Sequence, residues 1–311
     1  MAASDPTAPD LRQSQAMLML RMRFCPSDRK RTKMSRTSTN PKIRQETIEA
    51  LGDGFVEDVS RYVVPIFTDI DGAPVSVGTG LLLNTELDHV LVTAAHVLDG
   101  FRKDRTYYIY AGPAVKRAIA GEVLFSKLPT SGSRDDDLVD TAVVILEGSA
   151  DELPPFVAVG KESLPISLVV PQGVPRAEKR YAFLGFPASK ADTNRVEKNV
   201  SSSSYAYLGS SASSETYAQL GFDEAFHVIL PFHKRNVVTL DGAKFNFPSL
   251  KGMSGSPLWE LRKPSEGGRR VAAIMIRDKH KHDHVVVAAD IWFALKILSD
   301  HYHAAGRLPP D

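Results

Sequence analysis

Short runs of β-branched and aromatic residues, separated by turn residues, recur along most of this 311-residue chain. Runs of this length at regular spacing are typical of all-β sandwiches and barrels. Pairs such as Asp71-Gly72 and Asp99-Gly100 fall between runs and favour turns. A proline-rich stretch at 153–175 divides the runs into two groups of about six, which predicts two similar β-domains. The runs are RYVVPIF (61–67), PVSVGTGLLLN (74–84), HVLVTAAHVL (89–98), RTYYIYAG (105–112), GEVLFSKL (121–128), DTAVVIL (140–146), KRYAFLGFP (179–187), SYAYLG (204–209), FHVILPF (226–232), FNFPSL (245–250), SPLWEL (256–261), RVAAIMIR (270–277) and HVVVAAD (284–290).

The end of the chain, DIWFALKILSDHYH (290–303), has the period of a helix. We therefore expect a first β-domain at about 55–155, a second at about 165–290 and a C-terminal helix at about 290–303. Helix-compatible spacing also precedes the first strand, at about 41–59. The apolar positions that share one face of the terminal helix are Ile291, Ala294, Leu295 and Leu298.

The first 45 residues differ in charge from the rest of the chain. They hold ten lysines and arginines against three aspartates, whereas the whole chain has a net charge of only +1. This segment is polar, basic and without a sustained period, so residues 1–45 are predicted to be a disordered tail. A solvated tail is favoured over a nucleic-acid-binding arm, because charge runs at chain ends are usually solvated. Met34 begins a stretch that would also read as a protein start, so the alternative that residues 1–33 are an over-extended reading frame stays open.

The composition is ordinary for a soluble globular protein, with 43% hydrophobic and 24% charged residues. No apolar stretch approaches the roughly 18 residues that a membrane span needs, so no membrane association is expected. The segment MLMLRMRF (17–24) is too short and too rich in arginine for a signal-peptide core. Cys25 is the single cysteine, which excludes an intramolecular disulfide and fits a reducing compartment. We expect a cytoplasmic protein.

Three residue patterns together point to nucleophilic acyl chemistry. Ser254 lies between glycines in GMSGSP (252–257), His96 ends the small-residue turn TAAH, and Asp140 directly precedes a strand. A carboxylate that accepts the Nδ1–H of a histidine holds the tautomer whose Nε2 can take a proton from a serine. Taken alone, each has an ordinary interpretation as a turn, a structural histidine or a turn aspartate. The hypothesis rests on the three together.

In this order and context the motifs resemble those of the chymotrypsin-like (trypsin-fold) serine proteases of bacterial type. TAAH, DTAV (140–143) and GMSGSP resemble the histidine, aspartate and serine motifs of that family, and GTGLLL (78–83) resembles its Gly-Ser/Thr-Gly strand. The resemblance covers about residues 55–303. It implies an all-β fold of two six-stranded antiparallel β-barrels, perpendicular to each other, with the active site between them and a C-terminal α-helix.

The resemblance also implies a function. The trypsin-like protease domain, at 46–303, would be a serine endopeptidase that cleaves protein or peptide substrates. His96 would be the base, Asp140 would orient it, Ser254 would be the nucleophile, and the backbone N–H groups of Gly252 and Ser254 would form the oxyanion hole. The alternative from a different class is a catalytically silent protease fold that serves as a binding or scaffold module. An esterase that uses the same triad is not separated from a peptidase by sequence.

Two departures from the family's pattern bear on activation and specificity. Met253 stands where many animal members have an acidic residue that pairs with a new N-terminus, so a site formed without cleavage is expected. Pro248 stands where trypsin-type members have the aspartate of the specificity pocket. We place Pro248, Ala273, Ile274 and Ile276 in the substrate pocket and expect a preference for a small or medium apolar side chain.

No cofactor and no metal is expected. The chain has neither a phosphate-binding Gly-x-x-x-x-Gly-Lys-Ser/Thr loop nor a dinucleotide fingerprint. The cluster KHKHDH (279–284) holds possible zinc or nickel ligands in His280, His282, Asp283 and His284. All four lie in one short segment, whereas metal sites normally gather ligands from several elements, so a solvated hairpin tip is favoured.

Overall fold

The structure is a computed structural model. Most of the predicted tail, part of the helix-compatible stretch and most of the histidine cluster lie outside the residues that it describes. Only strand β1 (Met22–Phe24) of the predicted tail and helix α3 (Phe55–Ser60) of the helix-compatible stretch are described. Residues 280–283 of the histidine cluster also lie outside the described residues. The described residues are 22–24, 55–100, 105–110, 116–148, 156, 160–194, 199–232, 234, 237–239, 244–262, 268–279 and 284–308.

The first sheet is built from the first group of predicted strands. Its order is β6-β5-β2-β3-β4-β8-β7, and every neighbouring pair in that order is antiparallel. A short strand, β9 (Leu164–Pro165), adds to β3 in parallel. The strands are β2 (Val63–Ile70), β3 (Ala73–Asn84), β4 (His89–Ala94), β5 (Tyr107–Tyr110), β6 (Lys116–Ala118), β7 (Gly121–Phe125) and β8 (Thr141–Leu146).

The stretch from β6 to β7 closes this sheet into a barrel. β6 pairs with β5 at one edge of the sheet, and β7 pairs with β8 at the other. Between them the Ile119 N–H donates to the Tyr107 carbonyl (2.8 Å). The bend falls at Gly121, whose φ is +139° and where a Cβ atom would lie 1.8 Å from the Ile145 carbonyl oxygen. Since β6 and β7 act as one bent strand, the first barrel has six strand positions.

The second sheet is built from the second group of predicted strands. Its six principal strands run in the order β14-β19-β18-β17-β10-β13 and pair antiparallel, and β1, β15 (Val237–Thr239) and β16 (Lys244–Phe245) continue beyond β13. The Ala212 N–H, just after β13, donates to the Ile229 carbonyl of β14 (2.8 Å), which brings the ends of the six-stranded path together. The six are β10 (Arg180–Gly185), β13 (Tyr205–Ser210), β14 (His227–Pro231), β17 (Pro257–Leu261), β18 (Arg269–Lys279) and β19 (Val285–Asp290).

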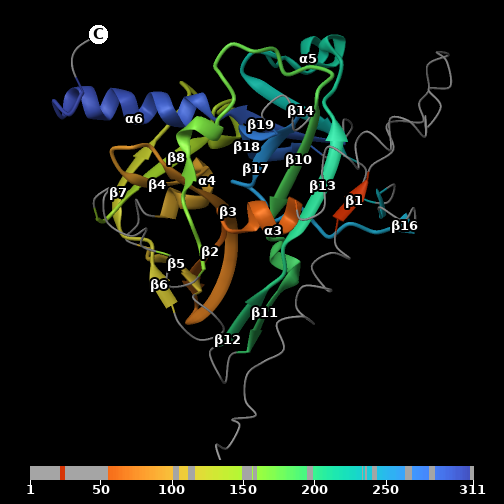
Figure 1. Ribbon diagram of the computed structural model, residues 1–311. Helices are drawn as coiled ribbons and strands as arrows, with labels where there is room; N and C mark the ends of the chain where they lie inside the picture. The colour runs from red at the N-terminus through yellow and green to blue at the C-terminus, as the bar shows by residue number, and fades with distance from the viewer. Residues whose placement is uncertain are drawn as a thin grey trace, which may run out of the picture.

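Few helices accompany the sheets. The predicted terminal helix is α6 (Trp292–Ala304), which leaves the second barrel and packs back against β7 and β8 of the first (Figure 1). The predicted fold class, two six-stranded antiparallel β-barrels followed by a C-terminal helix, is confirmed. The other described elements are helices α4 (Ala95–Leu98) and α5 (Ser214–Leu220), the 3₁₀ turns at Arg134–Asp136, Ile166–Leu168 and Ala188–Lys190, and the hairpin of β11 (Ala191–Asn194) and β12 (Asn199–Ser202).

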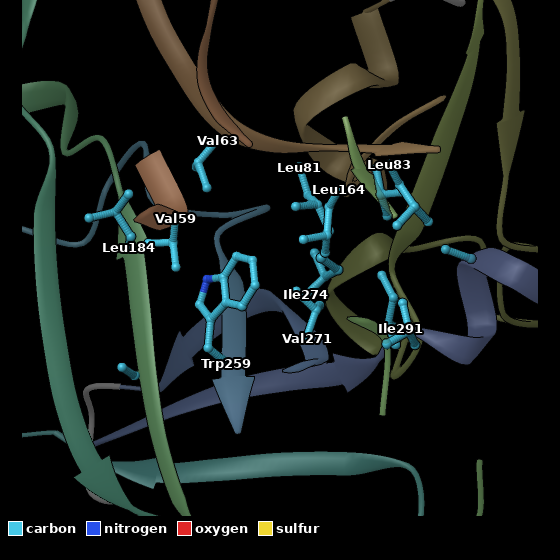
Figure 2. Packing of buried hydrophobic residues seen from close by; sticks show 14 of the residues in the cluster. Val59, Val63, Leu81, Leu83, Leu164, Leu184, Trp259, Val271, Ile274 and Ile291 are labelled. Atoms are coloured by element: carbon cyan, nitrogen blue, oxygen red, sulfur yellow. The ribbon is translucent and has the colours of Figure 1, made fainter. Parts of the chain in front are cut away.

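Alternation along the strands divides the core into layers. On β3, Leu82 faces the interior of the first barrel, whereas Leu81 and Leu83 face outward into a second cluster. That second cluster also takes Trp259 and Ile274 from the second barrel, together with the apolar face of α6. Figure 2 shows Leu81 and Leu83 of the first barrel and Trp259 and Ile274 of the second converging on this cluster. The barrels are therefore joined by a continuous apolar layer, which fixes the relative positions of the elements at their junction.

Candidate active site

His96 and Asp140 come from neighbouring strands of the first barrel. His96 lies in the single turn of α4, which follows β4 directly, and Asp140 lies immediately before β8. β4 and β8 pair in a register that places Ala94 opposite Thr141. The Ala95 N–H also donates to the Asp140 carbonyl (2.8 Å). This pairing brings together two residues that are 44 positions apart in the sequence.

The Asp140 carboxylate binds His96 at two points. Oδ1 accepts the His96 backbone N–H at 3.0 Å, and Oδ2 lies 2.7 Å from the imidazole Nδ1. The Asp140 side chain is 3% exposed, whereas the His96 side chain is 38% exposed. Because a buried carboxylate can only accept here, Nδ1 carries the proton and donates it. The Nε2 edge of the ring is thus left as the acceptor, on the side that faces solvent.

The backbone at Asp140 has an unusual conformation. Its φ is +36°, a value that residues other than glycine rarely adopt, although aspartate tolerates it better than most. Such conformations persist where the surrounding structure determines them, and they cluster at functional sites. The neighbouring segment therefore has to hold Asp140 in place.

The Ser254 loop has a shape that depends on glycine. Gly252 has a φ of +88° and Gly255 a φ of +89°. A Cβ atom on Gly252 would lie 2.6 Å from the Ala188 nitrogen, and one on Gly255 would lie 1.8 Å from the Thr79 carbonyl oxygen. Both positions require glycine, because a side chain there would strain the backbone and would clash with neighbouring atoms. Ser254, which lies between them, is therefore part of a tightly packed turn.

The peptide groups in this loop leave two donors free. The Lys251 carbonyl accepts the Ala188 N–H (2.7 Å), and a trans peptide then points the Gly252 N–H the opposite way. The Met253 carbonyl accepts the Ser256 N–H (3.0 Å), which similarly turns the Ser254 N–H outward. Within the described part of the chain, neither N–H donates to a protein group. Both N–H groups are therefore available as donors, which is one requirement of the predicted oxyanion hole.

Thr79 of β3 joins the serine loop to the first barrel. Its N–H donates to the Ser254 carbonyl (2.8 Å), and its hydroxyl donates to the Gly252 carbonyl (3.0 Å) and accepts the Phe186 N–H (3.1 Å). The Thr79 carbonyl in turn accepts the hydroxyl of Thr93, three residues before His96. The serine loop of the second barrel is thus anchored on the two strands that lead to His96.

A surface pocket of about 410 Å³ lies beside this junction and is lined by His96 together with Lys251, which stands three residues before Ser254. The pocket thus joins His96 to Lys251 at the start of the serine segment, while Ser254 itself is not among its lining residues. No hydrogen bond joins Ser254 Oγ to His96 among the described residues, while the His96–Asp140 bond is fully formed.

The residues predicted for the specificity pocket are all buried. Ala273, Ile274 and Ile276 are at most 1% exposed, and each lies in a different hydrophobic cluster. Pro248 is also buried, in the segment before the serine loop. None of the four lines the pocket beside His96. Their role in specificity stays a prediction.

One contributor to the site, Thr79, lies outside the predicted set, and one neighbouring serine, Ser256, has to be distinguished from Ser254. Thr79 belongs to the GTGLLL motif, but the sequence offers no sign that its hydroxyl reaches across to Gly252. Ser256 resembles Ser254 in its surroundings along the sequence, yet it is 0% exposed and its hydroxyl has no partner within the described residues. Burial thus distinguishes the two serines, since Ser254 is partly accessible.

Comparison with known proteins gives structural likeness without sequence likeness. No protein-family model and no curated protein matches the chain. Among solved structures, a thermostable serine protease from an extremophilic microorganism is similar at 14% identity, a TM-score of 0.45 and coverage of 76% of this chain and 95% of its own. Neuropsin, a serine protease of mouse brain, is similar at 11% identity and a TM-score of 0.49, with coverage of 78% of this chain and 94% of its own. An inactivated protease paralogue of the scabies mite is similar at 10% identity and a TM-score of 0.47, with coverage of 79% of this chain and 96% of its own.

Two further predictions concern the surroundings of the protein. In the described residues, no helix combines the length and apolar character needed to cross a membrane. The same residues contain no group of three or more histidine, cysteine, aspartate or glutamate side chains arranged to hold a metal ion. The predicted cytoplasmic location stays a prediction.

Proposed function

We propose that this protein is a serine endopeptidase that hydrolyses peptide bonds through His96, Asp140 and Ser254. The observation that carries the proposal is the two-point contact of Asp140 with His96, which fixes the ring and leaves Nε2 as an acceptor at the surface. A histidine held in this way can serve as a general base. Lys251, three residues before the partly accessible Ser254, lines the same pocket as His96.

The proposed reaction begins with transfer of the Ser254 Oγ proton to His96 Nε2. Oγ then bonds to the acyl carbon, and the carbonyl π electrons move to oxygen. Asp140 stabilises the imidazolium that forms, and the free N–H groups of Gly252 and Ser254 donate to the new oxyanion. His96 next gives its proton to the leaving amine as the C–N bond breaks. Water, activated by His96, hydrolyses the acyl-enzyme and regenerates the serine.

Polypeptide is the proposed substrate class. The pocket beside His96 is lined by apolar Val77 and Val97 and also by charged Asp99, Arg105 and Lys251, and it is large enough to hold a side chain of a bound peptide. A cleavage profile over a peptide library tests the predicted apolar preference, which a strong preference for arginine and lysine would overturn.

Labelling with a fluorophosphonate probe tests the proposed nucleophile. We expect the wild type to be labelled and Ser254→Ala and His96→Ala to be unlabelled while still folded. Ser256→Ala is the matched control, because it removes a neighbouring hydroxyl that is fully buried, and it should be labelled like the wild type. A folded wild type that takes no label would contradict the proposal and favour a catalytically silent binding module.

A further inference from the structure

The loop that leads into Asp140 is held from the opposite barrel. It runs from the 3₁₀ turn Arg134–Asp136 to Val139 and belongs to the first barrel. The donors that hold its carbonyl groups belong to β18 and β14 of the second barrel. Because Asp140 adopts a strained conformation, the support of this loop bears directly on where its carboxylate lies.

Arg277 provides most of this support. Its Nη1 donates to the Asp135 carbonyl at 2.5 Å, and its Nη2 donates to the Arg134 carbonyl at 3.4 Å and also to the Asp137 carbonyl. An arginine usually directs its planar fork at a carboxylate. Here it serves three backbone carbonyls near the end of a short 3₁₀ turn, one of which, that of Arg134, also accepts the Asp137 N–H.

His227 contacts the next carbonyl along the loop. Its Nε2 lies 3.1 Å from the Leu138 carbonyl oxygen, and its Nδ1 lies 3.1 Å from the Asp223 carbonyl oxygen of its own barrel. A neutral imidazole donates through one nitrogen only, so His227 donates to the Leu138 carbonyl in the tautomer with the proton on Nε2. In that tautomer His227 and Arg277 together give partners from the second barrel to the carbonyls of residues 134, 135, 137 and 138.

Inside the loop, Asp137 transmits this support to Asp140. Its carboxylate accepts the Ser126 hydroxyl at 2.9 Å, Arg134 Nη1 at 2.6 Å and the Val139 N–H at 3.0 Å. Burial raises the pKa of Asp137, but these donors and the Asp140 N–H outweigh it, so the pKa lies below its usual value. The loop is thus rigid between the carbonyls held by Arg277 and the backbone of Asp140.

We infer that Arg277, assisted by His227, is a positioning residue that holds the Asp140 carboxylate against His96 from across the barrel junction. Neither side chain touches the reacting atoms. The inference rests on the proposed function, since positioning matters for activity only if the triad works. It predicts that the orientation of the His96–Asp140 pair depends on how the two barrels are docked.

Two measurements on the full chain test this inference. The first is the maximal rate of fluorophosphonate labelling, separated from probe affinity by varying the probe concentration. Arg277→Ala should lower the maximal rate between about tenfold and a hundredfold with probe affinity unchanged, because a displacement of 1 Å can cost about 10² in rate. Arg277→Lys should recover part of the rate, since an ammonium donates to carbonyls without the fork.

The second measurement is the low-field proton NMR resonance of the His96 Nδ1–H, which reports the bond to Asp140 without requiring catalysis. It should shift or broaden in Arg277→Ala. Arg269→Ala is the matched control, because Arg269 lies on the same strand and instead pairs with Asp58 at 2.5 Å. This variant should match the wild type in both measurements.

The outcomes separate this inference from the proposed function. Wild-type labelling with an unchanged rate and resonance in Arg277→Ala would overturn the positioning role and leave the triad standing. A wild type that takes no label would overturn the proposed function, and the resonance alone would then decide the positioning role. If Arg277→Ala does not fold, His227→Phe replaces it, and an unchanged rate and resonance there would overturn the inference.

Discussion

The two halves of the candidate site are held by different kinds of interaction. In the first barrel, His96 and Asp140 are fixed by hydrogen bonds between a side chain and its partner, at 2.7 and 3.0 Å. In the second barrel, the Ser254 loop is fixed by backbone conformation, with positive φ at Gly252 and Gly255 and carbonyl groups anchored on Thr79. We therefore expect activity to be lost from the first half when a hydrogen-bonding group is replaced by one of the same shape. In the second half, we expect activity to be lost when an added atom changes the backbone conformation of the loop.

The largest expected effect is in the first half. Asp140→Asn keeps the volume of the side chain but replaces an acceptor at Oδ2 with an amide donor, so the Nδ1–H of His96 loses its partner and the other tautomer is favoured. We expect the rate of peptide hydrolysis or of probe labelling to fall by about 10⁴. Asp88→Asn is the control, because Asp88 is also a buried aspartate of the first barrel but pairs with Tyr302 and Arg307. A small loss of rate in Asp140→Asn would show that the first half of the site does not depend on the hydrogen bond between Asp140 and His96.

The next effect is in the second half. Gly252→Ala adds only a methyl group, but its Cβ would lie 2.6 Å from the Ala188 nitrogen, so the peptide carrying the oxyanion donor must move. Loss of one such donor lowers the rate by about 10²–10³.

Gly173→Ala isolates the contribution of conformation. Gly173 has a φ of +74° with open space around it, whereas Gly252 combines a φ of +88° with close contacts. Both variants should lose about 1–2 kcal/mol of unfolding free energy from the left-handed conformation. Only Gly252→Ala should lose labelling, measured beside chemical denaturation of each variant. Equal labelling of the two would show that the loop does not depend on its close contacts.

Thr79→Val probes the point where the halves meet. It keeps the shape but removes the hydroxyl that binds the Gly252 carbonyl and the Phe186 N–H, at a cost of about 1–3 kcal/mol for the groups left unpaired. Thr85→Val removes a half-buried hydroxyl that likewise binds one carbonyl and one N–H, both of Asp88, away from the serine loop and the pocket. Denaturation curves and labelling rates should show a loss of both stability and rate in Thr79→Val, and of stability alone in Thr85→Val.

The smallest effect concerns pH. Burial lowers the pKa of His227 from its model-peptide value of 6.5, although the Leu138 and Asp223 carbonyls and the charges of Asp223 and Asp290 act in the opposite direction. The unfolded chain therefore binds a proton that the folded chain resists, and stability falls as the pH drops below about 6.5. His227→Phe should flatten the pH dependence of the melting temperature between about pH 5 and 7. An unchanged slope would mean that other groups dominate it.

Most of the fold could be predicted from the sequence because its strands are short, apolar and punctuated by turns. The six first-barrel runs fall on β2, β3, β4, β5, β7 and β8, whereas β6 was not predicted. The run SYAYLG falls on the buried strand β13, but the serine-rich composition of 200–215 as a whole favours a mobile surface loop, and that interpretation is wrong. The helix α5 was not predicted, because its seven residues give too few turns for a helical period to show. Closure of the first barrel through Gly121 was also hidden, since it depends on contacts with strands at both edges.

The candidate site was predictable only where a motif carries the chemistry. The pairing of His96 with Asp140 follows from a familiar order of motifs, and the hydrogen bonds fit that prediction. Thr79, Arg277 and His227 could not be found in the same way, because each acts on backbone groups more than 80 residues away. A side chain that binds a carbonyl imposes no requirement on the identity of its partner, so it leaves no pattern in the sequence.

The position of Thr79 has a consequence for how the molecule is made. Thr79 precedes Ser254 by 175 residues, so on the ribosome the strand that shapes the serine loop is synthesised long before the loop itself. The nucleophile segment therefore emerges well after the strand that provides its hydrogen-bond partners. A fragment of the second barrel released by cleavage would carry Ser254 without that strand, and its loop would have no partner for the Gly252 and Ser254 carbonyls. Nicking the chain between the barrels should therefore silence the serine rather than release an unregulated hydrolase.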